Sequence, residues 1–178
     1  RIAAHTPCVD LAVVSRMDKS TLEQRLSHDL PQHLPLYSAC PVLVLPAGHD
    51  PAMPLGRRVA IGWQYERAAG RAVHDALPFL TQADAVSITT VHKEAPVDDP
   101  LDRIQNHLVR HGVRARGDAR TRQGGESNAH AILDHCREQQ ADMLVMGGYG
   151  RTGLKQMMRG SVTDHILAAD EIPVLLSH

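Results

Sequence analysis

The stretch Ala141-Asp142-Met143-Leu144-Val145-Met146-Gly147-Gly148-Tyr149-Gly150 decides the fold of this chain. Apolar side chains follow Asp142 without polar alternation, which predicts a strand over 142–146 that is buried on both faces, as in a parallel sheet. Glycines begin where this strand is expected to end. Nine residues separate Gly150 from Gly160 and Ser161, which stand at the start of a helix expected over 161–169.

Glycines and a serine between a strand and a helix are typical of a cradle for phosphate groups. Gly147 and Gly150 allow positive φ and a close approach of a ligand to the backbone. Ser161 occupies the expected N-cap, where unpaired N–H groups and the helix dipole favour an anion such as a polyphosphate. The spacing alone leaves an alternative open, a glycine-rich turn that only changes the direction of the chain.

Two better-known phosphate motifs are excluded. Residues 148–153 match G-x-G-x-x-G, and Asp170 and Glu171 follow about twenty residues later, where the dinucleotide fingerprint requires an acid. That acid should end the second strand, whereas Asp170 and Glu171 precede a strand expected over 172–176. No G-K-[ST] occurs anywhere in the chain, so the P-loop interpretation also fails.

The rest of the chain alternates between strand and helix patterns. A helix over 66–80 has an apolar face at helical spacing, formed by Ala69, Ala72, Val73, Ala76 and Leu80. The alternation predicts an open, parallel, five-stranded sheet with helices on both faces and a ligand crevice at the carboxyl ends of the strands. The expected strands are 58–63, 85–91, 113–121, 142–146 and 172–176, and the expected helices are 66–80, 99–111, 127–139 and 161–169.

These motifs resemble the universal stress protein family, whose nucleotide-binding members share G-x2-G-x9-G-[ST] after the fourth strand. The likeness covers residues 56–178 and includes Val59-Ala60-Ile61-Gly62-Trp63 as a first strand, Arg71-Ala72-Val73-His74-Asp75-Ala76-Leu77-Pro78 in a first helix, and the ending Pro173-Val174-Leu175-Leu176-Ser177-His178. It implies an adenine-nucleotide α-hydrolase-like fold and a stress-response regulator or sensor that binds ATP, or AMP or ADP, with Mg²⁺ as a companion of the phosphates. The implied nucleotide-binding residues are Gln64, Val91, Met146, Gly147, Gly150, Arg151, Gly160, Ser161 and Val162.

One departure from the family concerns the adenosine end of this site. Gln64 stands where the family has an acidic or amide residue, and it can hydrogen-bond a ribose or base although it is long and uncharged. Tyr65 and Glu66 replace the small residues usual beside it. Val91 matches the position whose backbone meets adenine.

The chain also resembles itself at an offset of 132 residues, which aligns Asp10 with Asp142 and Pro41-Val42-Leu43 with Pro173-Val174-Leu175. Residues 1–45 are therefore predicted to be the C-terminal part of a first, degenerate copy with strands 9–14 and 41–45. Residues 46–56, rich in proline and glycine, form the predicted linker, and 57–178 the complete domain. Arg1 aligns with the middle of a helix, so upstream residues are expected.

The first copy lacks the cradle. Ser15, Asp18, His28 and Asp29 stand at the positions of Gly147, Gly150, Gly160 and Ser161, and the added carboxylates would repel phosphate. Pro35 would interrupt the equivalent helix unless that helix is shortened. We interpret this copy as structural; a metal site formed by Asp18, His28, Asp29 and His33 matches no standard ligand spacing.

The last strands of both copies, 41–45 and 172–176, are apolar on both faces although each would be a sheet edge in an isolated unit. Exposed apolar edges invite pairing. We expect these two strands to pair with each other, with further dimerisation between chains.

Composition points to no nucleic-acid or membrane partner. The chain is 43% hydrophobic and 22% charged with a net charge of −1, and no apolar run reaches membrane-spanning length. Three cysteines without a close pair suit a reducing, cytoplasmic compartment. The arginines near strand 113–121 (Arg110, Arg114, Arg116, Arg120 and Arg122) are interpreted as protection of a sheet edge. His107 and His111 are interpreted as part of a solvated helix face.

The sequence assigns no catalytic residue and no metal ligand, and at most a weak ATPase is expected. Ser161 has no assigned base, although Asp164 and His165 lie nearby in sequence. Two alternatives to a nucleotide-binding regulator remain open. One is a scaffold with an empty cradle that acts by association, and the other is an enzyme that hydrolyses nucleotides or transfers a nucleotidyl group.

Overall fold

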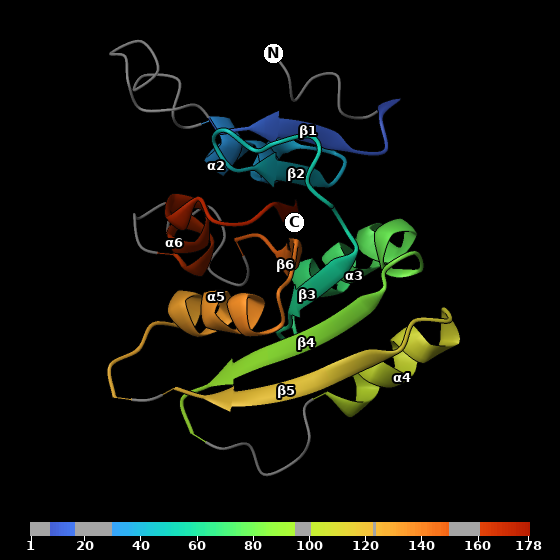
Figure 1. Ribbon diagram of the computed structural model, residues 1–178, viewed down its shortest axis with the longest axis vertical. Coiled ribbons are helices and arrows are strands. Elements are labelled where there is room, and N and C mark those ends of the chain that lie inside the picture. Colours follow the sequence, from blue (N-terminus) through green and yellow to red (C-terminus); the bar gives the residue numbers. More distant parts are fainter. Residues whose placement is uncertain (1–7, 17–29, 95–100, 123, 150–160) are drawn as a thin grey trace.

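Strands of the described residues form one sheet, and helices cover both of its faces (Figure 1). The computed structural model describes residues 8–16, 30–94, 101–122, 124–149 and 161–178. The strands are β1 (Ala12–Ser15), β2 (Val42–Leu45), β3 (Arg58–Gly62), β4 (Ala85–His92), β5 (Ala115–Thr121), β6 (Met143–Gly147) and β7 (Val174–Ser177). The helices are α2 (Leu30–Tyr37), α3 (Arg67–Leu80), α4 (Asp102–Arg110), α5 (Asn128–Glu138) and α6 (Val162–Ala169).

The sheet order is β1-β2-β7-β6-β3-β4-β5, and every neighbouring pair is parallel except β2 with β7. From β3 the chain moves outward through β4 to β5, then returns to the other side of β3 to form β6 and β7. The predicted five-stranded parallel sheet of residues 57–178 is confirmed. The strand order reverses between β3 and β6, which is the switch point where open α/β sheets bind ligands.

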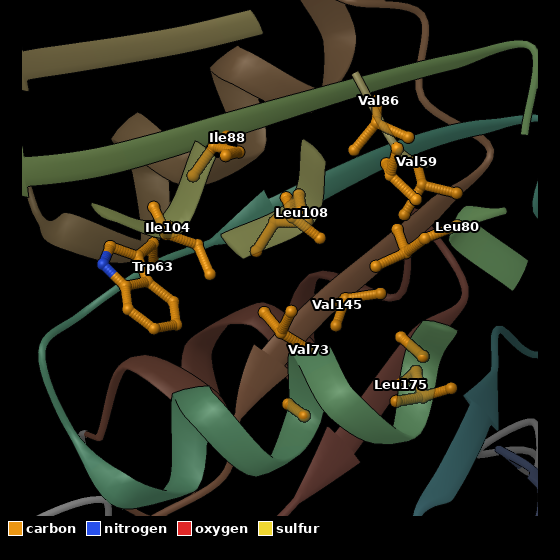
Figure 2. Packing of buried hydrophobic residues seen from close by; sticks show 14 of the residues in the cluster. Val59, Trp63, Val73, Leu80, Val86, Ile88, Ile104, Leu108, Val145 and Leu175 are labelled. Carbon is orange, nitrogen blue, oxygen red and sulfur yellow. The ribbon is translucent and has the colours of Figure 1, made fainter. Parts of the chain in front are cut away.

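Each face of the sheet has its own hydrophobic core. Figure 2 shows the first core, in which Ile104 and Leu108 of α4 and Val73 of α3 pack with strand residues such as Val145. The apolar face expected for the helix over 66–80 is buried here, and Ala72 and Ala76 are fully inaccessible. The second core lies under α2, α5 and α6. Helices on both faces are therefore confirmed.

Strands β2 and β7 pair as expected, and the pairing is antiparallel. Leu43 lies opposite Leu175, its own equivalent at the 132-residue offset, while Val42 lies opposite Leu176 and Val44 opposite Val174. A local two-fold relation therefore passes through the Leu43–Leu175 pair. Neither strand is a sheet edge, because β1 covers β2 and β6 covers β7.

The offset also relates helices and backbone hydrogen bonds. Helix α2 spans the eight residues equivalent to α6, despite Pro35 inside it. The backbone N–H of Ala12 donates to Pro41 O at 3.0 Å, and that of Leu144 to Pro173 O at 2.9 Å. The prediction that Pro35 requires a shorter helix than in the second copy is therefore wrong, because the proline removes one N–H donor within a helix that keeps its length.

The sheet ends at β5, as expected for an arginine-rich edge strand. His107 of α4 and the C-cap residue His111 are exposed, and their ring centroids are 4.8 Å apart. The helices of the described ranges include none that is both long and apolar enough to cross a membrane. Among the cysteines, Cys40 and Cys136 are buried and Cys8 is exposed, and all are unpaired.

Candidate functional site

The carboxyl ends of β3, β4 and β6 lie side by side. Gly62 at the end of β3 pairs with Met146 on one side and with Thr89 on the other. The backbone N–H of Trp63, the residue after β3, donates to Thr89 O at 2.8 Å, so the chain stays hydrogen-bonded to β4 as far as the residue before Gln64. The ends of β3 and β4 and the start of the glycine-containing loop after β6 therefore meet at the switch point of the sheet.

Gly147 ends β6 directly against the start of α3. A Cβ at this position would lie 2.5 Å from Ala69 N and 2.7 Å from the carbonyl carbon of Ala68. The glycine is therefore required by the close approach of α3 to the sheet. Gly147 does not adopt the positive φ that a glycine allows, whereas Tyr149, two residues later, has a φ of 52°. The sequence identified a required glycine, but its reason in the described structure is helix packing.

Ser161 is the N-cap of α6, as predicted. Its hydroxyl oxygen accepts a hydrogen bond from Asp164 N at 3.0 Å, so one N–H of the first turn is satisfied by the cap. The Tyr149 hydroxyl donates to Asp164 Oδ1 at 3.3 Å. Burial and the neighbouring Asp164 carboxylate raise the pKa of Tyr149, so the phenol stays protonated and keeps this bond. The bond holds the first turn of α6 beside the end of β6.

The other predicted site residues surround this edge in different ways. Gln64 is exposed, and its carbonyl accepts from Glu66 N at 2.7 Å before α3 begins. Met146 is buried in the second core, against which Val91 and Val162 pack with partial exposure. Gly150, Arg151 and Gly160 lie outside the described residues, as do Asp18, His28 and Asp29 of the first copy.

A Ser-His-Asp arrangement, which the sequence analysis missed, lies elsewhere; its serine and histidine are buried, whereas the side chain of its aspartate is 41% exposed. His135 Nε2 is 3.0 Å from Ser87 Oγ, and its Nδ1 is 3.3 Å from Asp118 Oδ2. Burial lowers the pKa of His135, with a smaller contribution from Arg120, so the ring is neutral and its contact with Asp118 is a hydrogen bond rather than an ion pair. Ser87 is 5% exposed, which denies a substrate access to its hydroxyl. We therefore assign these residues a structural role in joining α5 to β4 and β5.

Cavities lie at other places on the described surface. One of about 550 Å³ opens at the amino ends of β3, β4 and β5, where Arg58, Arg114 and Arg116 line it. Another of about 600 Å³ lies between the carboxyl end of β5 and the N-terminus of α5, with Asp118, Glu126 and His130 among its lining residues. Neither lies at the switch point, where several of the predicted loop residues fall outside the described ranges.

A parallel sheet with helices on both faces and a switch point between β3 and β6 defines an open, doubly wound α/β protein. The model of the universal stress protein family matches residues 64–178. The chain therefore belongs to the universal stress protein family, as its motifs predicted.

Individual relatives agree with this assignment. Universal stress protein YxiE of Bacillus subtilis is 31% identical over an alignment of 88 residues, and the match covers 43% of this chain and 59% of YxiE. The crystal structure of a universal stress protein from Archaeoglobus fulgidus superimposes with a TM-score of 0.78 at 18% identity, covering 99% of this chain and 63% of that one. A universal stress protein in complex with cAMP gives a TM-score of 0.58 at 21% identity, covering 68% of this chain and 96% of its own. The matches thus span less than two thirds of YxiE and of the Archaeoglobus protein.

Proposed function

We propose that residues 57–178 bind ATP or a related adenine nucleotide at the carboxyl ends of β3 and β6, and that the protein acts as a stress-response regulator or sensor. The observation that carries this proposal is the Tyr149–Asp164 hydrogen bond at 3.3 Å. It holds the capped N-terminus of α6 beside the end of β6, at the switch point of the sheet. A helix N-terminus there offers backbone N–H groups and a positive dipole end to phosphates.

The adenosine end of the ligand would lie toward β3 and β4. Gln64 is exposed beside this edge, and Val91 lies two residues beyond Thr89, which pairs with Gly62. The glycine pattern of the chain and the cAMP complex of one structural relative also support an adenine nucleotide. The Asp164 carboxylate in the first turn of α6 would repel a phosphate group. A Mg²⁺ ion carried by the phosphates would reduce that repulsion.

The test is a direct titration with a matched control from the other copy. Protein purified under mild conditions is analysed by mass spectrometry for bound nucleotide, and the nucleotide-free protein is titrated with ATP by calorimetry. Gly160→Asp should weaken ATP binding at least 30-fold, or about 2 kcal/mol, because a charged side chain would enter the expected phosphate position. His28→Asp, at the equivalent position of the first copy, should leave the affinity unchanged.

Three results separate the alternatives. If nucleotide neither co-purifies nor binds, the protein is a scaffold that acts through association. If Gly160→Asp binds ATP as well as the wild type does, the nucleotide lies elsewhere. Turnover of bound ATP with a second substrate would support the enzyme alternative.

We further propose that residues 1–45 are the end of a first, structural copy joined by the linker 46–56 to the nucleotide-binding one. The correspondence of α2 with α6 and of β2 with β7 supports this division. So does the Archaeoglobus structure, which covers 99% of this chain, whereas the cAMP-bound relative covers 68%. Dimerisation between chains and a cytoplasmic location remain part of the proposal, the latter from the unpaired thiols.

A further inference from the structure

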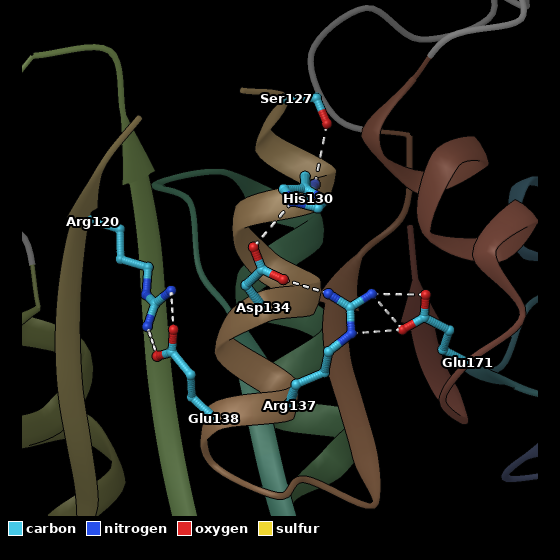
Figure 3. Close-up of polar contacts among 7 residues, drawn as sticks. All are labelled: Arg120, Ser127, His130, Asp134, Arg137, Glu138 and Glu171. Atoms are coloured by element: carbon cyan, nitrogen blue, oxygen red, sulfur yellow. Dashed lines mark hydrogen bonds and ion pairs between the residues drawn. The ribbon is translucent and has the colours of Figure 1, made fainter. Parts of the chain in front are cut away.

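Three side chains of metal-binding type gather at the N-terminal end of α5. Glu126 precedes the N-cap residue Ser127, and His130 and Asp134 follow at intervals of four residues, which places them along one side of the helix. Each offers one ligand atom, and these three atoms lie within 4.8 Å of one another. His130 Nε2 is 3.2 Å from Asp134 Oδ2. Figure 3 shows His130 above Asp134 along α5, with Ser127 at its start.

We infer that Glu126, His130 and Asp134 form a binding site for a divalent transition metal of the Zn²⁺ type. Zinc bonds nitrogen and oxygen ligands at about 2.0–2.2 Å, so two ligands of a tetrahedral site are about 3.4 Å apart. The His130–Asp134 separation of 3.2 Å already meets this requirement. The ligand atom of Glu126 lies within 4.8 Å of the other two, so the carboxylate reaches the same ion by a side-chain adjustment of at most about 1.4 Å.

A second layer of contacts holds the Asp134 ligand in place. Arg137 Nη1 bonds Asp134 Oδ1, leaving Oδ2 directed at His130. Arg137 is itself held by Glu171, whose Oε1 and Oε2 accept from its Nη2 at 2.8 and 2.6 Å (Figure 3). Glu171 therefore balances the arginine charge, and Asp134 keeps its charge for the ion. Contacts of this kind orient the ligands of protein metal sites.

The ligand chemistry selects the class of metal. An imidazole nitrogen with two carboxylates suits Zn²⁺ or Co²⁺, whereas Mg²⁺ and Ca²⁺ prefer oxygen ligands alone. The positive end of the α5 dipole, about half an elementary charge, repels a cation. This end of the helix is exposed to solvent, and the two carboxylates together carry more negative charge than the dipole carries positive charge. Glu126 and His130 also line the 600 Å³ cavity beside β5. A metal held by three protein ligands would therefore keep an open position toward that cavity for water or an exchangeable ligand.

The experiment is a calorimetric titration of the metal-free, nucleotide-free full chain with Zn²⁺, repeated with Co²⁺ to record its visible absorption bands. We expect one ion per chain. His130→Gln and Glu126→Gln should each weaken Zn²⁺ binding at least ten-fold and remove the Co²⁺ bands. Both side chains are at least partly exposed, so the variants should keep the wild-type circular dichroism spectrum.

The matched control is the double variant His107→Gln/His111→Gln, which removes the exposed histidine pair at the C-terminal end of α4. Its Zn²⁺ affinity should stay within two-fold of the wild type. The inference is overturned if Zn²⁺ fails to saturate below about 1 mM, if His130→Gln binds as tightly as the wild type, or if the α4 variant alone loses binding. Because ATP is absent throughout, none of these results depends on the proposed nucleotide site.

Discussion

The two sides of the β2–β7 pair have the same backbone but different requirements. Arg16 N donates to Leu45 O at 2.9 Å in the proposed first copy, and Gly148 N to Ser177 O at 2.8 Å in the proposed second copy. At the preceding position the first copy has Ser15, which is exposed, whereas the second has Gly147, which lies against the backbone of α3. The comparison teaches that hydrogen bonding within the sheet determines where each strand ends, whereas the element that packs on that end determines which residue type can occupy it.

The largest expected effect comes from breaking the β2–β7 pairing, which would join the two proposed copies. Val174 is 1% exposed and lies opposite Val44, so Val174→Lys buries a charge without a partner. We expect a loss on the order of 4 kcal/mol in the free energy of unfolding, measured by urea denaturation. Val13→Lys, on the outer strand β1 and 54% exposed, is the control and should change stability by less than about 0.5 kcal/mol. Equal stability of the two variants would contradict the central role of the β2–β7 pair.

An intermediate effect on stability should follow from substituting alanine for the residues at the ends of β6 and β1. Gly147→Ala places a Cβ 2.5 Å from Ala69 N, so α3 or β6 must shift, and we expect a loss of about 2 kcal/mol. Gly148→Ala is the adjacent control, because its Cβ would meet nothing closer than 3.7 Å. Ser15→Ala tests the first copy and should be nearly neutral. If all three variants have the same melting temperature, the close packing of α3 is not the reason for a glycine at position 147.

Much of the fold was predictable because local patterns and packing agree. Each expected element from 58–63 onward is present with boundaries that differ by three residues or fewer. The sequence repeat also anticipated which strands pair across the copies. It could not anticipate that α2 keeps the length of α6 around Pro35, since the loss of one N–H donor can be tolerated when the proline and its neighbour Leu34 are buried.

The candidate sites were less accessible to sequence reasoning. Ser161 could be identified because capping is local, and the structure confirms it. The role of Gly147 depends on how closely α3 approaches, which no spacing encodes. Ser87, Asp118 and His135 are far apart in sequence and meet only through packing of α5 on the sheet. Glu126, His130 and Asp134 did carry a local signal, the E-x3-H-x3-D spacing, although the sequence predictions did not include them.

The smallest expected effect is a pH dependence of stability that only one side of the comparison can have. His135 belongs to α5, whereas the residue at the equivalent position of the proposed first copy is Ala3, which cannot titrate. Burial lowers the pKa of His135 below its ordinary value of 6.5. Above that pH the ring is neutral in both folded and unfolded chains, so it adds no pH dependence. Below it the unfolded chain binds a proton that the folded chain refuses, and stability falls as pH falls.

The loss from His135 can reach about 1.4 kcal/mol for each pH unit between 6.5 and its folded pKa. The measurement is urea denaturation at several pH values from 7.5 to 5. His135→Gln should be less stable than the wild type at pH 7.5, because Ser87 and Asp118 lose a partner, yet its stability should decline less steeply toward pH 5. His107→Gln, an exposed histidine, should keep the wild-type slope. A slope that is unchanged in His135→Gln would assign the acid sensitivity to other groups and leave the contacts of His135 with Ser87 and Asp118 a purely geometric role.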